Sequence, residues 1–389
     1  MILKKYLFYF KIIRSFTNQF LGYFIVQKLT YFKPILMINS NPYIKGRGAQ
    51  INPANQFHNL IYDENPVDWS IEKKADIPTE FIEVYPKTIL NKVISPDIPA
   101  THSMNPYQGC EHGCIYCYAR NTHNYWGYSA GLEFESKILV KKNAATLLEQ
   151  KLKHKNWKAT PVMLSGNTDC YQPIEGKLEI TRDILKTFWK YRHPVSIITK
   201  NSLILRDLDI LKQLATHNLV RVAISITTLQ EELRRYLEPR TATIAQRLKT
   251  VETLAKNGIP TMVMMAPIIP GLNDNEILKL VKTAADLGAS RVGYTIVRLD
   301  GDVATIFEDW IRKTMPDRAD RVLNRIRDCH GGELASKKYG KRMSGEGNIA
   351  NIIKEQFRIA RQLYMKDQPA FSYNLELHNT FKSPQLKLF

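Results

Sequence analysis

The sequence predicts an α/β protein whose centre is an open, partial (β/α)6 barrel over residues 101–300. Short apolar, β-branched runs alternate with helical stretches of about 10–16 residues, a pattern typical of βαβ units around a parallel sheet. With a first strand just before Cys110, about six units can be counted, too few for a closed eight-stranded barrel. A cysteine-rich loop follows that first strand, at the edge where such sheets carry their reactive groups.

Five further strands are predicted from runs of valine, isoleucine and methionine bounded by proline, glycine or polar residues. In chain order they are PVMLSG from Pro161, PVSIITK from Pro194, LVRVAISI from Leu219, IPTMVMMAPI from Ile259 and SRVGYTIV from Ser290. Because a helical pattern separates each strand from the next, neighbouring strands are expected to run parallel.

The helices between these strands are predicted from apolar residues at helical spacing. They are NAATLLEQKLKH, LEITRDILKTFWKY, RDLDILKQLATH, IAQRLKTVETLAKNG and DNEILKLVKTAADLG. The last two end in Asn-Gly and Leu-Gly, and glycine is a common stop at the C-terminus of a helix.

The N-terminal flank has two parts. Residues 1–36 are a basic, apolar leader, which we expect to be a misassigned extension ahead of a true start at Met37, with an amphipathic membrane-surface helix as the alternative. Its longest apolar run, FLGYFIV, is far shorter than the roughly 20 residues of a membrane span. Residues 37–100 form an arm and extension in which KGRGAQINPANQ, from Lys45, is expected to be flexible.

The C-terminal flank is predicted as a basic helical region over residues 301–366, followed by a flexible tail over residues 367–389. The net charge of the whole chain is +18, which favours a polyanionic partner such as DNA or RNA, or serves solubility alone. The five cysteines are an odd number, and three are too close together for a disulfide framework, which indicates a reducing, cytoplasmic setting.

The stretch NPYQGCEHGCIYCYAR places Cys110, Cys114 and Cys117 within eight residues. A zinc site would require a fourth ligand, for which His112 or His123 are candidates. The cysteines could also be packed as small hydrophobic residues. An iron–sulfur cluster explains the missing fourth thiol, since three thiolates leave one iron of a [4Fe-4S] cluster open to another ligand.

CxxxCxφC with an aromatic residue at φ, here Tyr116, resembles the signature of the radical S-adenosylmethionine (SAM) superfamily. The resemblance implies a partial (β/α)6 barrel and a [4Fe-4S] cluster on Cys110, Cys114 and Cys117. It also implies that the open iron binds the amino and carboxylate groups of SAM. Reductive cleavage of SAM would then give a 5′-deoxyadenosyl radical that abstracts hydrogen from the substrate. An electron donor such as flavodoxin or ferredoxin would be required.

The same resemblance implies residues that bind SAM. The turn SGNTD follows the second strand, where the superfamily has a Gly-Gly-Glu-type turn that meets the methionine amino group, although the glutamate is absent here. Lys200 ends the third strand, where it could neutralise the methionine carboxylate or a substrate phosphate; a solvated lysine is the alternative interpretation. Ser225 ends the fourth strand and could bond the ribose or the carboxylate; an ordinary strand-end serine is the alternative interpretation. Tyr116 would lie near the adenine. The predicted SAM-binding residues are Tyr116, Ser165, Gly166, Asn167, Lys200 and Ser225.

Within the superfamily, the cysteine motif C-x3-C-x-Y-C-Y together with three later stretches resembles the spore photoproduct lyase-like branch, commonly labelled DNA repair photolyases. The later stretches are SGNTDCYQPIE, ITKNSLILRDLDIL and ISITT. In that branch Tyr116 and Tyr118 would correspond to tyrosines that assist radical relay. The branch's hydrogen-donating cysteine lies just before the strand-two serine, where this chain has Leu164. Cys170 is the nearest candidate for a replacement donor, with a buried strand-end thiol as the alternative interpretation, and Cys329 is the weaker candidate.

Other polar residues have two interpretations each. Asp169 and Glu175 are candidates for proton transfer or for anchoring a substrate hydroxyl. For Glu175, a structural role at the start of a helix is an equal alternative. Arg240 could face a phosphate. The cluster KKYGKR, Lys337 to Arg342, suits either a phosphate-tracking surface or a solvated loop.

The chain ends in QLKLF, which resembles the peptide that bacterial replication proteins insert into the sliding clamp. Gln385, Leu386, Leu388 and Phe389 are the predicted contacts, and packing against the barrel is the alternative. We therefore predict a radical SAM enzyme of the photolyase-like branch, a lyase type, that acts on nucleic acid. The alternatives are a radical SAM enzyme that modifies a protein, peptide or metabolite, and a non-enzymatic zinc-containing nucleic-acid-binding module. No membrane partner is expected.

Overall fold

The computed structural model describes residues 43–57, 77–98, 100–366, 368 and 370–382. The chain divides into two compact units, residues 1–43 and 44–389, and the description below concerns the second. The predicted leader and the terminal QLKLF peptide lie outside the described residues. Within those residues, no helix combines the length and apolar character that crossing a bilayer requires.

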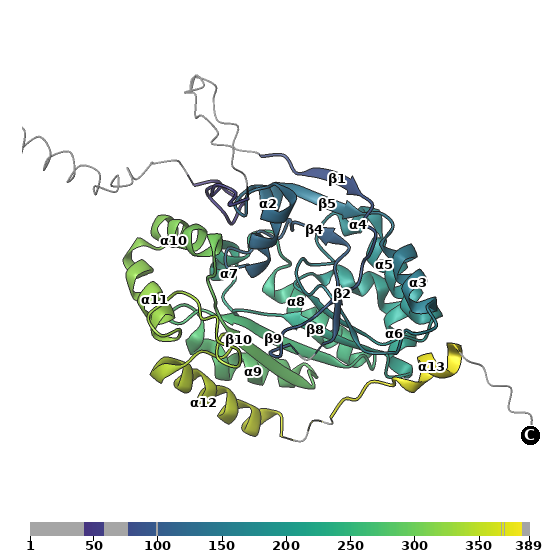
Figure 1. The fold of residues 1–389 in the computed structure, drawn as a ribbon. Helices are drawn as coiled ribbons and strands as arrows, with labels where there is room; N and C mark the ends of the chain where they lie inside the picture. Colours follow the sequence, from purple (N-terminus) through teal and green to yellow (C-terminus); the bar gives the residue numbers. More distant parts are fainter. Residues whose placement is uncertain (1–42, 58–76, 99, 367, 369, 383–389) are drawn as a thin grey trace, which may run out of the picture. The chain divides into compact units, whose positions relative to one another are not determined.

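A seven-stranded sheet with the order β10-β9-β8-β7-β6-β3-β2 forms the centre of the fold (Figure 1). Its first six strands in this order are parallel, and β2 pairs antiparallel with β3. The strands are β2 (Asn91–Lys92), β3 (His102–Met104), β6 (Val162–Leu164), β7 (Val195–Thr199), β8 (Val220–Ser225), β9 (Thr261–Ile268) and β10 (Arg291–Ile296). Six parallel strands in chain order confirm the predicted α/β fold class, and among the described strands no pairing joins β10 to the opposite edge.

Each predicted helix is present between the strands. They are α3 (Ala144–Lys153), α5 (Ile180–Lys190), α6 (Leu208–Thr216), α8 (Ile244–Lys256) and α9 (Ile277–Asp286). The start of α8 shows why: the side chain of Thr243 accepts from the backbone of Gln246, whose own side chain bonds back to Thr243. The shorter elements between strands are α4 (Glu175–Leu178), η2 (Ser202–Asp207), α7 (Glu231–Leu237) and η3 (Asp274–Glu276).

A second, three-stranded sheet with the order β1-β5-β4 was not predicted. It contains β1 (Glu80–Val84), β4 (Tyr107–Gln108) and β5 (Lys137–Lys141), and β5 pairs parallel with β1 and antiparallel with β4. Between β4 and β5 lie the cysteine loop, η1 (Tyr118–Trp126) and α2 (Glu133–Ser136). The small sheet therefore fixes both ends of the segment that carries the cysteines.

The C-terminal region is helical, as predicted, with α10 (Asp302–Thr314), α11 (Pro316–Asp328) and α12 (Gly347–Tyr364). The predicted flexible tail is wrong in part, because residues Glu376–Lys382 form α13. His378 of α13 is buried, and its Nδ1 lies 2.6 Å from the carbonyl oxygen of Tyr191. A buried histidine with a backbone partner explains why this short helix packs instead of extending into solvent.

The flexible arm predicted from Lys45 is also corrected in part. Arg47 and Ala49 are buried, and the Arg47 guanidinium donates to the carbonyl oxygen of Glu135 at 2.8 Å. This segment is thus part of the packed structure.

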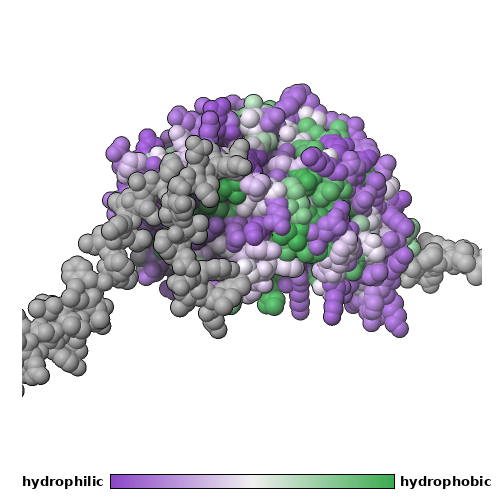
Figure 2. All heavy atoms as spheres, turned by 90° about the horizontal axis from the view of Figure 1, so that it is seen from above, coloured by the Kyte–Doolittle hydropathy of each residue, from purple (hydrophilic) through white to green (hydrophobic). Residues whose placement is uncertain are grey.

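The apolar residues form two main clusters: one lies around the large sheet and its helices, and the other joins the cysteine loop to α7, α10 and α11. On the face shown in Figure 2, mainly hydrophilic side chains surround an apolar area.

Candidate active site

The cysteine loop folds tightly at the carboxyl edge of the parallel strands. Cys110 donates its backbone N–H to the carbonyl oxygen of Phe134 at 2.9 Å, and Ile115 donates to that of Leu237 at 3.0 Å. Gly113 has a φ of +67°, in the left-handed region that favours glycine, and a Cβ there would lie 2.8 Å from Glu135. The turn between the first two cysteines therefore depends on glycine.

The three thiols lie in a mostly buried environment. Cys110 and Cys114 are buried and Cys117 is half-buried. Burial raises the pKa of the Cys110 thiol well above its usual value and the charge of Asp169 adds to this, while backbone N–H groups of Asp169 and His112 lower it. Burial likewise raises the pKa of Cys114 to about 12, against the lowering effect of Lys200. Nearby donors and a lysine can thus stabilise thiolates, the form in which cysteine would bind a metal.

A buried ion network holds the loop from behind. Arg120 and Glu135 are both fully buried and form an ion pair of 2.5 Å. Arg120 also donates to the carbonyl oxygen of Cys114 at 3.0 Å, and Glu135 accepts from the backbone N–H groups of Gly48 and Ala49. A Cβ on Gly48 would lie only 1.7 Å from the carbonyl oxygen of Gly113. The segment at residues 47–49, the cysteine loop and α2 are therefore one packed unit.

The turn after β6 contacts the cysteine loop. Ser165 has a φ of +72°, and its Oγ accepts from the backbone of Cys170 at 2.7 Å. Asn167 donates its backbone N–H to the side chain of Asn105 at 2.9 Å. The hydroxyl of Tyr118 donates to the carbonyl oxygen of Gly166. A residue beside the last cysteine thus contacts the turn that was predicted to bind SAM.

Asp169 links three parts of the site. Its Oδ1 accepts from Thr199 Oγ1 at 2.8 Å, its Oδ2 accepts from the backbone of Lys200 at 2.8 Å, and His112 Nδ1 lies 3.3 Å away. Burial would raise the pKa of Asp169, but His112 and the backbone donors lower it to about 2. With its oxygens occupied by donors, the ionised carboxylate is suited to orienting the loop, the β6 turn and the end of β7.

A second buried network lies beside Cys114 and Cys117. The hydroxyl of Tyr116 donates to Glu238, which also accepts from Thr227 at 2.8 Å and pairs with Arg247 at 2.5 Å. Burial would raise the pKa of Glu238, but Arg247 and Lys200 lower it to about 2.

The Nζ of Lys200 lies 5.9 Å from the centre of the Tyr116 ring. Lys200 itself is half-buried. Sequence patterns did not indicate Glu238, Arg247, Glu135 or Arg120, because single charged residues on helices and loops carry no motif.

The remaining candidates occupy more ordinary positions. Cys170 is fully buried in the main apolar cluster, and Cys329 is buried as well. Ser225 ends β8 as predicted and is buried, with its carbonyl oxygen accepting from Arg247 at 3.0 Å. Glu175 starts α4 and bonds Tyr107, Thr181 and Arg206, so the helix-start interpretation describes it.

Two arginines of the predicted phosphate-binding features bond to other segments of the chain. The guanidinium of Arg240 donates to the carbonyl oxygen of Gly46 at 3.0 Å, so this part of the arginine holds the N-terminal segment. In the Lys337 to Arg342 cluster, Arg342 bonds Asp97 at 2.5 Å. The exposed ring of Tyr339 lies 4.5 Å below that guanidinium.

The histidines proposed as zinc ligands have other surroundings. His112 faces Asp169, and His123 is buried beside the rings of Tyr128 and Phe134. Among the described residues, which include all five cysteines, no three cysteine, histidine or carboxylate side chains converge as ligands of one metal ion.

Comparisons with known proteins agree with this geometry. The sequence profile of the radical SAM superfamily matches residues 104–284. An uncharacterized protein of Mycobacterium tuberculosis is 34% identical over 244 residues, which span 62% of this chain and 72% of that protein. An uncharacterized protein of Methanocaldococcus jannaschii is 34% identical over 199 residues, 51% of this chain and 71% of that one.

Solved structures give the fold. A spore photoproduct lyase complexed with dinucleoside spore photoproduct has a TM-score of 0.54 and 17% identity, covering 73% of this chain and 79% of that chain. A spore photoproduct lyase variant with bound AdoMet and the same dinucleoside has a TM-score of 0.54 and 16% identity, covering 76% and 82%.

Proposed function

The chain belongs to the radical SAM superfamily, and from this premise we propose that it cleaves SAM reductively to modify a nucleic acid. The observation that carries the proposal is the contact between two segments at the carboxyl edge of the sheet. The loop with Cys110, Cys114 and Cys117 meets the turn after β6 through Tyr118 and Gly166. In parallel sheets, this edge is where ligands bind.

Cys110, Cys114 and Cys117 would hold the [4Fe-4S] cluster. The donor set fits, because three thiols lie on one glycine-dependent loop, with backbone N–H groups near Cys110 and Lys200 near Cys114. With cluster and SAM bound, reductive cleavage supplies methionine and a 5′-deoxyadenosyl radical that takes a hydrogen atom from the substrate. A protein such as flavodoxin or ferredoxin would supply the electron.

SAM would occupy the space bordered by the β6 turn and the ends of β7 and β8. Ser165, Gly166 and Asn167 offer small polar groups for its methionine part. Lys200, whose Nζ lies 5.9 Å from the centre of the Tyr116 ring, offers a positive charge for its carboxylate. Glu238 fixes the Tyr116 ring through its hydroxyl, so this ring can present an unchanging surface to the adenine.

Nucleic acid is the substrate class that three features favour. The net charge is +18, and exposed aromatic side chains, which suit base stacking, follow the cysteine loop directly on η1. Tyr125 is 76% exposed and stacks with Phe57 at 4.9 Å between ring centres. Two similar solved structures are of spore photoproduct lyase with a dinucleoside. Because Leu164 stands where that branch has its cysteine, the thymine photoproduct itself is not part of the proposal.

The test uses anaerobically reconstituted protein with dithionite. We expect 5′-deoxyadenosine from the wild type and none from a triple Cys110→Ala, Cys114→Ala, Cys117→Ala variant. Cys170→Ala serves as the matched thiol control and should retain cofactor cleavage, because Cys170 packs in the main apolar cluster. Activity that persists in the triple variant would contradict the proposal.

The substrate is tested separately, by mass spectrometry of nucleic acids and of proteins after incubation with the active enzyme. A modified nucleoside is the expected product. A modified peptide or metabolite without any modified nucleoside would contradict the nucleic-acid part and leave the cofactor chemistry in place.

A further inference from the structure

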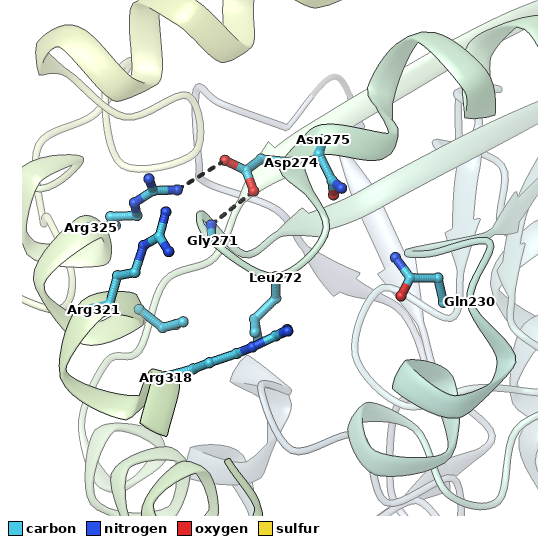
Figure 3. A pocket seen from close by; sticks show the side chains of 9 residues that line it. Gln230, Gly271, Leu272, Asp274, Asn275, Arg318, Arg321 and Arg325 are labelled. Atoms are coloured by element: carbon cyan, nitrogen blue, oxygen red, sulfur yellow. Dashed lines mark hydrogen bonds and ion pairs between the residues drawn. The ribbon is translucent and has the colours of Figure 1, made fainter. Parts of the chain in front are cut away.

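A pocket of about 410 Å³ lies between α11 and the loops that follow β8 and β9 (Figure 3). No predicted site residue lines it. One wall is formed by Arg318, Arg321 and Arg325 of α11, and the facing wall by polar residues of the loops, Gln230, Asp274 and Asn275. The pocket is thus polar and carries three arginines against one aspartate.

The three arginines share one face of α11, since they are spaced by three and four residues. Only Arg325 is paired across the pocket, with Asp274 at 3.7 Å. Arg318 and Arg321 have no ion-pair partner among the described residues, and both are exposed. Two guanidinium groups are therefore available to a ligand.

The nearby carboxylates do not neutralise these two arginines. Asp274 also accepts from the backbone of Gly271 at 2.8 Å. Glu276, behind Gln230, accepts from Thr228 Oγ1 and from the side-chain amide of Gln230, each at 2.7 Å. On α11 itself, Asp320 pairs with Arg312 at 3.0 Å. Like charges three or four residues apart destabilise a helix, and a bound anion relieves this repulsion.

The pocket is connected to the candidate active site. Leu272 and Val322, which line it, belong to the same apolar cluster as Cys114 and Tyr116. The loops after β8 and β9 emerge at the carboxyl edge of the sheet, as the cysteine loop does. The helix η1 contacts the start of α10 through Asn124 and Asp302 at 2.6 Å, and α10 packs with α11 in that cluster. The pocket and the candidate active site therefore lie at the same edge of the sheet and share one apolar cluster.

We propose that this pocket binds a backbone phosphate of the nucleic-acid substrate, at a nucleotide outside the one that reacts. The inference rests on the proposed function. Arginine binds phosphate through two parallel N–H groups, and Arg318 and Arg321 supply such groups on adjacent turns. The amides of Gln230 and Asn275 line the facing wall, where a sugar attached to the phosphate would lie.

The pocket is large enough for one nucleotide unit, and the neighbouring aromatic residues favour nucleic acid over an acidic peptide. Ligand pockets generally measure about 300–1,000 Å³, so this volume admits a sugar together with its phosphate. The exposed aromatic residues on η1, Tyr118, Tyr125 and Trp126, offer stacking surfaces that an acidic peptide would not use.

The experiment measures binding of a fluorescein-labelled, single-stranded 20-nucleotide DNA by fluorescence anisotropy at several salt concentrations. The pocket variant is Arg318→Glu with Arg321→Glu, on an exposed helix face. The control is Lys155→Glu with Lys212→Glu, two exposed lysines that change the net charge equally and lie away from α11. Dithionite-dependent 5′-deoxyadenosine formation is measured on all proteins and should stay unchanged.

We expect the pocket variant to bind at least tenfold more weakly than the control. We also expect it to lose about 0.7 from the slope of log K against log salt for each phosphate contact removed. Equal binding by the pocket and control variants would overturn the pocket assignment. If the wild type binds no DNA, the nucleic-acid part of the proposed function fails instead.

Inorganic phosphate and poly-glutamate serve as competitors. Release of the labelled DNA only at competitor concentrations far above that of the DNA agrees with the proposal. Tight binding of inorganic phosphate that DNA does not displace would assign the pocket to a free phosphate compound. Competition by poly-glutamate as strong as that by unlabelled DNA would assign it to an acidic peptide.

Discussion

Replacing Glu135 by alanine should severely destabilise the segment that carries the cysteines. Glu135 pairs with Arg120 at 2.5 Å where both side chains are fully buried, and it accepts from Gly48 and Ala49 at 3.0 and 2.8 Å. Its loss leaves a buried guanidinium without its counter-charge, which costs about 3–5 kcal/mol. Because a folded domain has only about 5–15 kcal/mol of stability, this loss is a large fraction of the total.

The assay is urea unfolding followed by circular dichroism, with iron measured per chain after anaerobic reconstitution. Lys186→Ala is the control, since it removes a surface ion pair with Asp183 in which both side chains are more than half exposed. Such pairs contribute under about 1 kcal/mol. We expect Glu135→Ala to unfold at much lower urea and to bind less iron. A free energy of unfolding within 1 kcal/mol of the control would refute the proposed role of this network.

Three further predictions follow from the site. The folded-state pKa of Glu238 is lowered from 4.5 to about 2, so its stabilising effect is present above pH 4.5 and is lost as the pH falls toward 2. Glu238→Gln should therefore be less stable than the wild type by about 3 kcal/mol at pH 7, with a gap that closes in acid unfolding curves; a gap independent of pH would contradict this. Tyr118→Phe removes the bond to Gly166 and should weaken SAM binding about two- to tenfold in equilibrium dialysis, with iron content unchanged; unaltered affinity would count against the Gly166 turn as part of the SAM site. Deleting Gln385 to Phe389 should weaken sliding-clamp pull-down and leave 5′-deoxyadenosine formation intact, and an unchanged pull-down would reject the clamp hypothesis.

The large sheet and its helices were predictable because their signals are local and repeated. Runs such as PVSIITK become β7 because alternating residues are buried on one face, and Thr243 with Gln246 specifies the start of α8. The small sheet was not predictable, because β1 and β5 are five-residue strands paired across a separation of 57 residues. Neither strand has a turn signal that points to its partner.

In the candidate site, too, the local motifs were predictable from sequence and the contacts between distant segments were not. The spacing of Cys110, Cys114 and Cys117 and the SGNTD turn were found from sequence, because each motif is continuous in the chain. The residues that orient them come from distant segments of the chain. Glu238 accepts a hydrogen bond from Tyr116, from which it is separated by 122 residues in sequence, and Arg47 bonds Glu135 across a separation of 88 residues. Only the fold brings such partners together, and their burial gives them no sequence pattern of their own.

The pairing of residues 47–49 with Glu135 has a consequence for biosynthesis. At the ribosome, the amide of Ala49 emerges 86 residues before the carboxylate that it binds. At about 5–20 residues per second, that partner follows roughly 4–17 seconds later. The cysteine loop therefore cannot assume its final form as the chain first emerges, and the proposed cluster would be inserted only after α2 has been translated.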